Sequence, residues 1–274
     1  MKPVFRIAPT PSGYLHIGNA MSFVYTAQLA KAMKADLLLR IDDMDSERTR
    51  PEYVQDIFDT LDFLNIQPTV GPTNANELAT KYAQIHRSNL YDAALQQLIN
   101  TGLAYACTCS RKTLEQQNGN CVCNGTSATL QDKDVALRIK VPPDTIINFT
   151  DVLLGSVSIN LYQHNKNFVV RRREGVPAYQ LTSVCDDIFF GVTHIVRGVD
   201  LLPSTAMQLY LATLLNYTPF LHTNFYHHPV LKNSNGEKMS KSAGAESIKE
   251  LCKHKTAEEL SVIIQQLLKE NGLV

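Results

Sequence analysis

The chain has 274 residues, of which 44% are hydrophobic and 19% charged, and 26 lysines and arginines balance 26 aspartates and glutamates. A net charge of zero excludes a protein that coats nucleic acid by bulk electrostatics, but it leaves room for a local basic groove. The first residues carry no apolar signal core, and no run approaches 18 apolar residues, so we expect a cytoplasmic protein without a membrane segment. In that compartment the six cysteines are expected to be thiols or metal ligands.

Strands and helices alternate over the first hundred residues. The expected elements are a strand at 4–8, a helix at 20–33, a strand at 36–41, a helix at 50–64 and an amphipathic helix at 81–100. The strand at 36–41 is a continuous apolar run, as in parallel sheets that are buried on both faces. This order of elements predicts a doubly wound α/β domain with a parallel sheet.

The pattern changes near residue 103. Short β-like runs at 135–141, 155–161 and 167–171 follow a cysteine-rich stretch, then come an apolar run at 188–196, a helix at 204–215 and two short helices within 245–273. We therefore expect a split catalytic domain, 1–102 and 176–244, with an inserted α+β subdomain at 103–175 and a helical tail at 245–274.

Two distant segments each suit one half of an ATP site. In PTPSGYLHIGN (9–19), His16 stands where a turn becomes a helix, and the helix N-terminus attracts anions. Gly18 lets a nucleotide approach the backbone closely. In KMSKS (238–242), Lys238 and Lys241 lie in a loop after Gly236, from which a lysine can reach phosphates. Taken alone, each segment also fits a solvated helix start or an ordinary surface loop.

Together these segments resemble the HIGH and KMSKS signatures of class I aminoacyl-tRNA synthetases. FRIAPTPSGYLH (5–16), LRIDDMD (39–45), GVPAYQL (175–181) and HIVRG (194–198) are similar to the glutamyl-tRNA synthetase family. The matches extend from Arg6 to Ser242. The resemblance implies a Rossmann-like, HUP-type catalytic domain that uses Mg-ATP and glutamate. About thirty residues follow Ser242, which we expect to be too few for an anticodon-binding domain. In its short length the chain resembles the truncated branch of this family, the glutamyl-queuosine tRNA(Asp) synthetases.

The resemblance also implies roles for individual residues. The glutamate site would comprise Arg6, Ala8, Thr10, Asp42, Tyr179 and Arg197, and the ATP site His16, Gly18, Asn19, Lys238, Met239 and Lys241. His16 and Lys241 would be the catalytic residues. Arginine is the natural bidentate partner of a carboxylate, although structural salt bridges to Asp186 or Asp187 would also explain the arginines.

The sequence departs from the family at one position of the glutamate site. Asp42 stands where the family has a glutamate that holds the substrate ammonium. Aspartate keeps the charge but shortens the side chain by one methylene, so either the substrate lies differently or Asp43 shares the task.

Four cysteines form two short pairs, Cys107 with Cys109 and Cys121 with Cys123. In a cytoplasmic chain this spacing suits a tetrahedral structural zinc site, with reduced, unligated thiols as the alternative. Compared with the family pattern, Cys123 follows the third ligand by two residues instead of four.

Two further clusters of polar residues have more than one interpretation. Arg171, Arg172 and Arg173 form a basic run that is either a solvated strand end or a contact for tRNA phosphates. His227 and His228 are adjacent and fit a strand edge beside the ATP site better than a metal site.

The expected reaction has two steps, activation of glutamate to glutamyl-adenylate and transfer to queuosine in the anticodon loop of tRNA(Asp). We expect a monomer whose partners are this tRNA, glutamate and ATP. Three alternatives stay open: a truncated synthetase that charges a tRNA 3′ end, an amino-acid activator with a non-tRNA acceptor, and a non-catalytic tRNA-binding protein.

Overall fold

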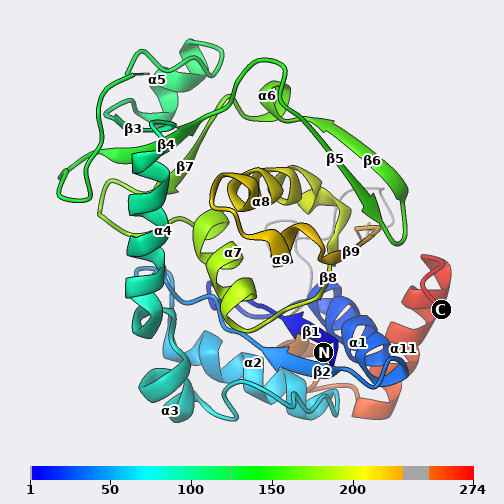
Figure 1. Cartoon of the computed structure of the whole chain (residues 1–274). Helices are drawn as coiled ribbons and strands as arrows, with labels where there is room; N and C mark the ends of the chain where they lie inside the picture. The colour runs from blue at the N-terminus through cyan, green and yellow to red at the C-terminus, as the bar shows by residue number, and fades with distance from the viewer. Residues whose placement is uncertain (1, 124, 231–246) are drawn as a thin grey trace. The chain divides into compact units, whose positions relative to one another are not determined.

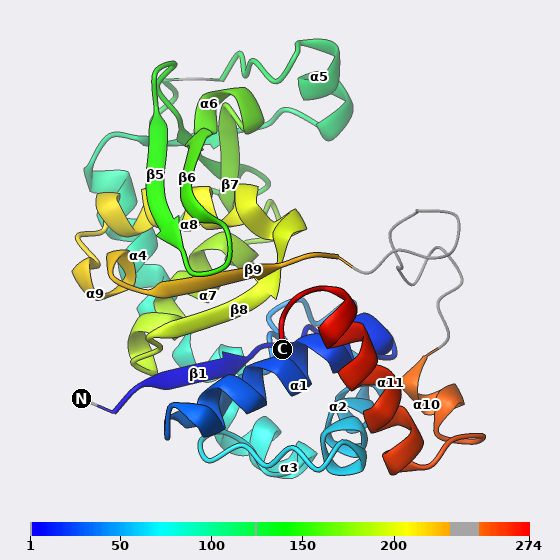
Figure 2. The same cartoon turned by 90° about the vertical axis from the view of Figure 1, so that its right-hand side faces the viewer.

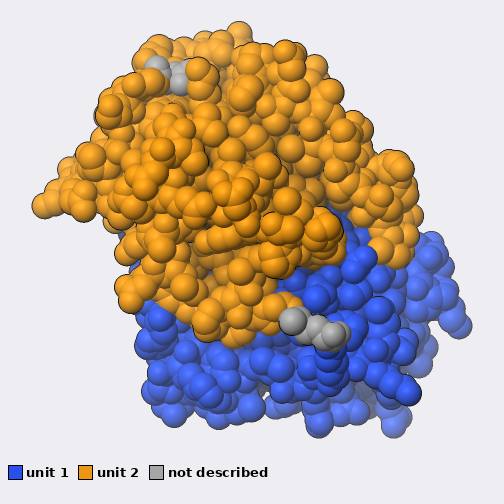
Figure 3. Space-filling model, in the orientation of Figure 1, with its two compact units in different colours: residues 1–86, 192–200, 224–274 blue, residues 87–191, 201–223 orange. Residues whose placement is uncertain are grey.

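The computed structural model describes residues 2–123, 125–230 and 247–274 (Figure 1). They form two compact units, which Figure 3 distinguishes by colour. Unit 1 comprises 1–86, 192–200 and 224–274, and unit 2 comprises 87–191 and 201–223. In the described part of the chain, no helix combines the length and the apolar character needed to cross a membrane.

Unit 1 is built on four parallel strands in the order β2-β1-β8-β9, of which β1, β8 and β9 are labelled in Figure 2. Its strands are β1 Val4–Ile7, β2 Asp36–Leu39, β8 His194–Gly198 and β9 Asn224–His228. Its α-helices are α1 Ile17–Ala32, α2 Pro51–Phe63, α3 Ala75–Glu77, α10 Ile248–Leu251 and α11 Ala257–Glu270. The predicted α/β class with a parallel sheet is confirmed, as are the two short helices near the C-terminus.

Strand alternation gives this sheet two different faces. Phe5, Val196 and Tyr226 lie on one face and belong to an apolar core with residues of α1, α2 and α11. Arg6, Ile195 and the residues in register with them lie on the opposite face. The apolar face holds the helices of unit 1, and the opposite face carries the arginines discussed below.

Unit 2 contains the predicted insertion together with helices on either side of it in sequence. Its strands are β3 Ala104–Cys107, β4 Ala136–Lys140, β5 Ile146–Asp151, β6 Gly155–Asn160 and β7 Asn167–Arg171. Its helices are α4 Ser88–Asn100, α5 Arg111–Gln116, α6 Leu161–His164, α7 Tyr179–Phe189, α8 Leu202–Leu214 and α9 Thr218–Leu221. β3, β4 and β7 form an antiparallel sheet, and β5 and β6 pair as an antiparallel hairpin. The sequence patterns did not predict β3 or β5.

The helix expected at 81–100 is interrupted, so that prediction is wrong in its first turns. A π-helical turn covers Leu78–Tyr82, a 3₁₀ turn covers Gln84–Arg87, and α4 begins only at Ser88. Ala83 between them is extended (φ −54°, ψ 144°), and the Gln84 amide donates to the Asp43 carboxylate at 2.8 Å. A tertiary hydrogen bond here replaces the bond that a continuous helix would make.

Candidate active site

His16 caps the N-terminus of α1 with its own side chain. Its Nδ1 accepts the Gly18 amide at 3.1 Å, and the Asn19 side chain accepts the His16 amide at 3.1 Å, which together form a capping box. Because Nδ1 accepts, the proton of the neutral imidazole is on Nε2, which is therefore a donor. The helix begins at Ile17, three residues earlier than expected, because of this cap. His16, Gly18 and Asn19 thus form one rigid turn.

Residues from two other segments hold this turn in place. The Leu15 amide donates to the buried Asp56 carboxylate of α2 at 2.8 Å. The Ile248 amide donates to the Leu15 carbonyl at 2.8 Å, and Ser247 forms an isolated antiparallel bridge with His16. The chain that returns from the KMSKS segment therefore lies against the turn that carries His16. Lys238, Met239 and Lys241 lie outside the described residues.

A row of buried cationic side chains lies on the second face of the unit 1 sheet, at the carboxyl ends of the strands. Arg6 is in register with Ile195, so Arg197, two residues later, shares its face. Arg40 shares this face too, because Arg6 also pairs with Leu38. The exposed fraction is 5% for Arg6, 2% for Arg40 and 4% for Arg197. Buried guanidinium groups at this edge form an environment for carboxylates.

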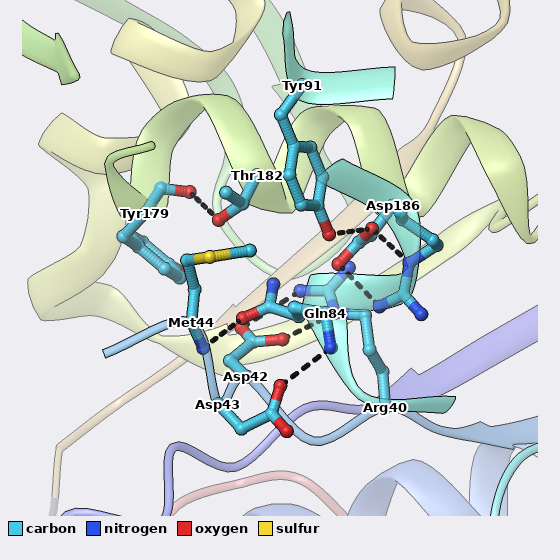
Figure 4. Close-up of polar contacts among 10 residues, drawn as sticks. Arg40, Asp42, Asp43, Met44, Gln84, Tyr91, Tyr179, Thr182 and Asp186 are labelled. Atoms are coloured by element: carbon cyan, nitrogen blue, oxygen red, sulfur yellow. Dashed lines mark hydrogen bonds and ion pairs between the residues drawn. The ribbon is translucent and has the colours of Figure 1, made fainter. Parts of the chain in front are cut away.

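The loop after β2 carries Asp42 and runs beside the turn after β1. The Asp42 amide donates to the Pro9 carbonyl at 2.9 Å, which places Asp42 next to the segment of Ala8 and Thr10. The Asp42 carboxylate is 6% exposed and accepts Arg40 Nε at 2.7 Å and Nη2 at 3.2 Å (Figure 4). This bidentate pair fixes the orientation of the short aspartate side chain.

Gln84 closes the same loop from the interrupted helix. Its side-chain oxygen accepts the Met44 amide at 2.8 Å, and its own amide donates to Asp43 at 2.8 Å (Figure 4). Gln84 is 1% exposed. The Asp43 carboxylate therefore has a structural hydrogen bond of its own. Sequence reasoning missed Gln84, because a single glutamine within an amphipathic helical pattern does not differ from an ordinary solvent-facing residue.

In unit 2, Tyr179 and Asp186 both belong to α7. Tyr179 is the first residue of this helix and is 40% exposed. The fully buried Asp186 accepts Arg87 Nε at 2.7 Å, Arg87 Nη2 at 3.1 Å and the Tyr91 hydroxyl at 2.7 Å. Burial raises the pKa of Tyr91, and the Asp186 charge raises it further. Within unit 2, Asp186 thus ties α4 to α7 as a structural acceptor.

The sulfur atoms of Cys107, Cys109, Cys121 and Cys123 all lie within 4.8 Å of one another. Sulfur–sulfur distances are 3.3 Å for Cys107–Cys121 and 3.7 Å for both Cys109–Cys121 and Cys109–Cys123. Tetrahedral zinc with bonds of ~2.3 Å needs sulfur atoms about 3.8 Å apart, so the four thiols fit that ion. Burial raises the pKa of Cys109 to about 12, whereas hydrogen bonds from Thr108 lower the pKa of Cys123 to about 7.

The basic run is divided by its contacts. Arg171 is 4% exposed and donates to the carbonyls of Leu130 and Asp132 at 2.6 and 2.7 Å. A phosphate-binding role for Arg171 is therefore wrong, because its guanidinium holds a loop within unit 2. Arg173 is exposed and donates to the Thr108 carbonyl, and Arg172 lies 4.0 Å from Glu174.

A family model described as tRNA synthetases class I (E and Q), catalytic domain, matches residues 3–268. The chain belongs to this family. The family expected from the two signatures is thereby confirmed.

Known relatives give the same assignment. The glutamyl-Q tRNA(Asp) synthetase of Pseudomonas putida is 38% identical over 237 residues, which cover 86% of this chain and 75% of that protein. The glutamyl-Q tRNA(Asp) synthetase of Pseudomonas aeruginosa is 38% identical over 239 residues, which cover 87% of this chain and 77% of that protein. The crystal structure of glutamate-tRNA synthetase from Elizabethkingia anophelis matches with a TM-score of 0.74 at 26% identity, covering 89% of this chain. The chain spans 53% of that longer synthetase.

Proposed function

We propose that this protein, as a monomer, activates glutamate with Mg-ATP and transfers it to the queuosine base of tRNA(Asp). The observation that carries the first step is the pairing of two features of unit 1. His16 Nε2, at the N-terminus of α1, offers a donor to phosphate, and Arg6 and Arg197 offer charge to carboxylates. The acceptor is inferred from the names of the relatives that match most of this chain.

Activation requires an attack by the substrate α-carboxylate on the α-phosphate of ATP, with pyrophosphate leaving. No protein side chain forms a covalent bond in this step, so catalysis depends on position and charge. His16 Nε2 donates toward the phosphate oxygens, and Lys241 neutralises the charge that develops on them. Arg6 and Arg197 bind the substrate carboxylates, while Asp42, oriented by Arg40, receives the ammonium. Ala8 and Thr10 complete the glutamate site within unit 1, and the role of Tyr179 there stays a prediction from the resemblance. Gly18, Asn19, Lys238 and Met239 complete the ATP site.

In the second step a hydroxyl of the queuosine cyclopentenediol attacks the carbonyl of the adenylate and releases AMP. The same cluster of unit 2 that fits zinc would hold a structural ion through Cys107, Cys109, Cys121 and Cys123. That ion would stabilise the antiparallel sheet that begins with β3, because Cys107 is the last residue of that strand.

The test is glutamate-dependent ATP–pyrophosphate exchange, followed by transfer of labelled glutamate to tRNA(Asp) with and without queuosine. We expect exchange with glutamate and labelling of the queuosine-bearing form alone. Arg197→Gln should abolish exchange, whereas Arg48→Gln, at a side chain that is 70% exposed in an ion pair with Asp45, should not. Labelling of tRNA(Glu) at its 3′ end would contradict the proposal, and so would exchange that depends on another amino acid.

A further inference from the structure

His228 is a buried histidine that the proposed mechanism does not use. It is the last residue of β9 and is 5% exposed. It is in register with Gly198, the last residue of β8. The carboxyl ends of parallel strands are where open α/β sheets bind their ligands. His228 is therefore at the ligand-binding edge of the unit 1 sheet.

The hydrogen bonds of His228 define its tautomer. Its Nδ1 lies 2.8 Å from the carbonyl oxygen of Pro229, and a carbonyl oxygen only accepts, so Nδ1 carries a proton. Burial lowers the pKa of the imidazole and outweighs the opposing effects of the Pro229 carbonyl and the Asp200 charge. The ring is then neutral near pH 7, and Nε2 holds a lone pair.

That lone pair has no hydrogen-bond partner among the described residues, although the Nε2 atom is buried. Buried polar atoms in native proteins are almost always satisfied by protein, water or ligand, so an orphan acceptor at a ligand-binding edge calls for a donor. His194 provides a contrast within the same sheet. Its two ring nitrogens lie 2.8 Å from Thr193 Oγ1 and 3.4 Å from Asn224 Nδ2.

The face of the sheet on which His228 lies indicates which substrate supplies the donor. Along β9, His228 alternates with His227, which is in register with Arg197 and so belongs to the carboxylate-binding face. His228 instead shares the face of Tyr226, which packs in one apolar core with residues of α1. The His16 turn is the start of α1, so His228 faces the ATP side. A neutral acceptor there suits the neutral amine of a base better than the ammonium of glutamate.

We propose that His228 Nε2 accepts a hydrogen bond from the 6-amino group of the ATP adenine and makes the enzyme selective for that base. This inference rests on the proposed use of ATP. Guanine carries a carbonyl oxygen at the corresponding position, which would oppose the Nε2 lone pair. Purine riboside triphosphate carries only hydrogen there and lacks the donor.

The test compares kcat/KM for ATP and for purine riboside triphosphate in pyrophosphate exchange. The wild type should prefer ATP by about 5- to 30-fold, the value of one buried hydrogen bond and its desolvation. In His228→Phe this preference should fall to near unity, and His228→Gln should restore part of it because its amide oxygen reaches the position of Nε2. The ratio does not depend on the fraction of folded enzyme, so a loss of stability does not obscure it.

His194→Phe is the matched control, since it also replaces a buried histidine of this sheet and should leave the ATP preference unchanged. An unchanged preference in His228→Phe would overturn the inference, as would an equal loss of preference in His194→Phe. Failure of the proposed function is distinguishable, because the wild type itself would then show no exchange.

Discussion

Gly18 lies directly beside the His16 imidazole, so Gly18→Ala is a sharp test of this turn of the predicted ATP site. A Cβ at residue 18 would lie 2.9 Å from His16 Cε1 and 3.0 Å from His16 Nδ1. Non-bonded carbon atoms normally lie about 3.5–4.0 Å apart, so the imidazole must move by about 0.5–1 Å. That movement breaks the 3.1 Å bond from the Gly18 amide to Nδ1 and redirects Nε2.

The effects on stability and on activity should separate. Loss of the cap destabilises by about 0.5–2 kcal/mol, while alanine in place of glycine in a helix returns up to about 1 kcal/mol. The net loss is at most about 2 kcal/mol and should lower the melting temperature by no more than about 4–8 °C. Loss of a preorganised donor to the developing charge should lower kcat of exchange by about 100- to 1,000-fold.

Pyrophosphate exchange and thermal unfolding of the same preparation measure both effects. Thr256→Ala is the matched control, since Thr256 forms the equivalent capping box at the start of α11. It should show a similar loss of stability with unchanged kcat. A wild-type kcat in Gly18→Ala would refute the assigned role of the His16 turn, and an equal loss of kcat in Thr256→Ala would show that only stability was measured.

Three further predictions concern Gln84 in unit 1, and Asp186 and the four cysteines in unit 2. Gln84→Ala removes the acceptor of the Met44 amide and should raise KM for glutamate, with a stability loss of about 1–3 kcal/mol. Gln84→Glu keeps an acceptor oxygen and should keep the wild-type KM. Equal KM values in the wild type and both variants would contradict a positioning role for Gln84. Asp186→Ala removes the carboxylate that pairs with the buried Arg87 and should lower the free energy of unfolding in urea by about 3–5 kcal/mol. Tyr91→Phe removes one hydrogen bond to the same carboxylate and should cost less. A larger loss in Tyr91→Phe than in Asp186→Ala would be inconsistent with the structure. The purified protein should contain one zinc per chain by elemental analysis, and Cys107→Ser should lose it and become more sensitive to proteolysis; a metal-free wild type would contradict the zinc site.

Much of the fold was predictable because local patterns and tertiary structure agree there. The strand predicted from the apolar run at 36–41 and the end of the 81–100 helix at Asn100 required no information from distant residues. The 81–100 prediction failed because the amphipathic pattern records burial alone. Gln84 forms its hydrogen bonds with a loop about forty residues away, and no local pattern encodes that pairing.

The sequence by itself determined the chemistry of this protein, because a histidine at a helix start, a lysine-rich loop and four paired cysteines require specific residue types in a specific order. The tertiary structure alone decided how these residues are used. Parallel register placed Arg6 and Arg197 on one face and His228 on the other, and burial made Arg171 structural. The tertiary structure also pairs Arg40 with Asp42. Such outcomes depend on which strands become neighbours, a long-range property that the identity of single residues does not contain.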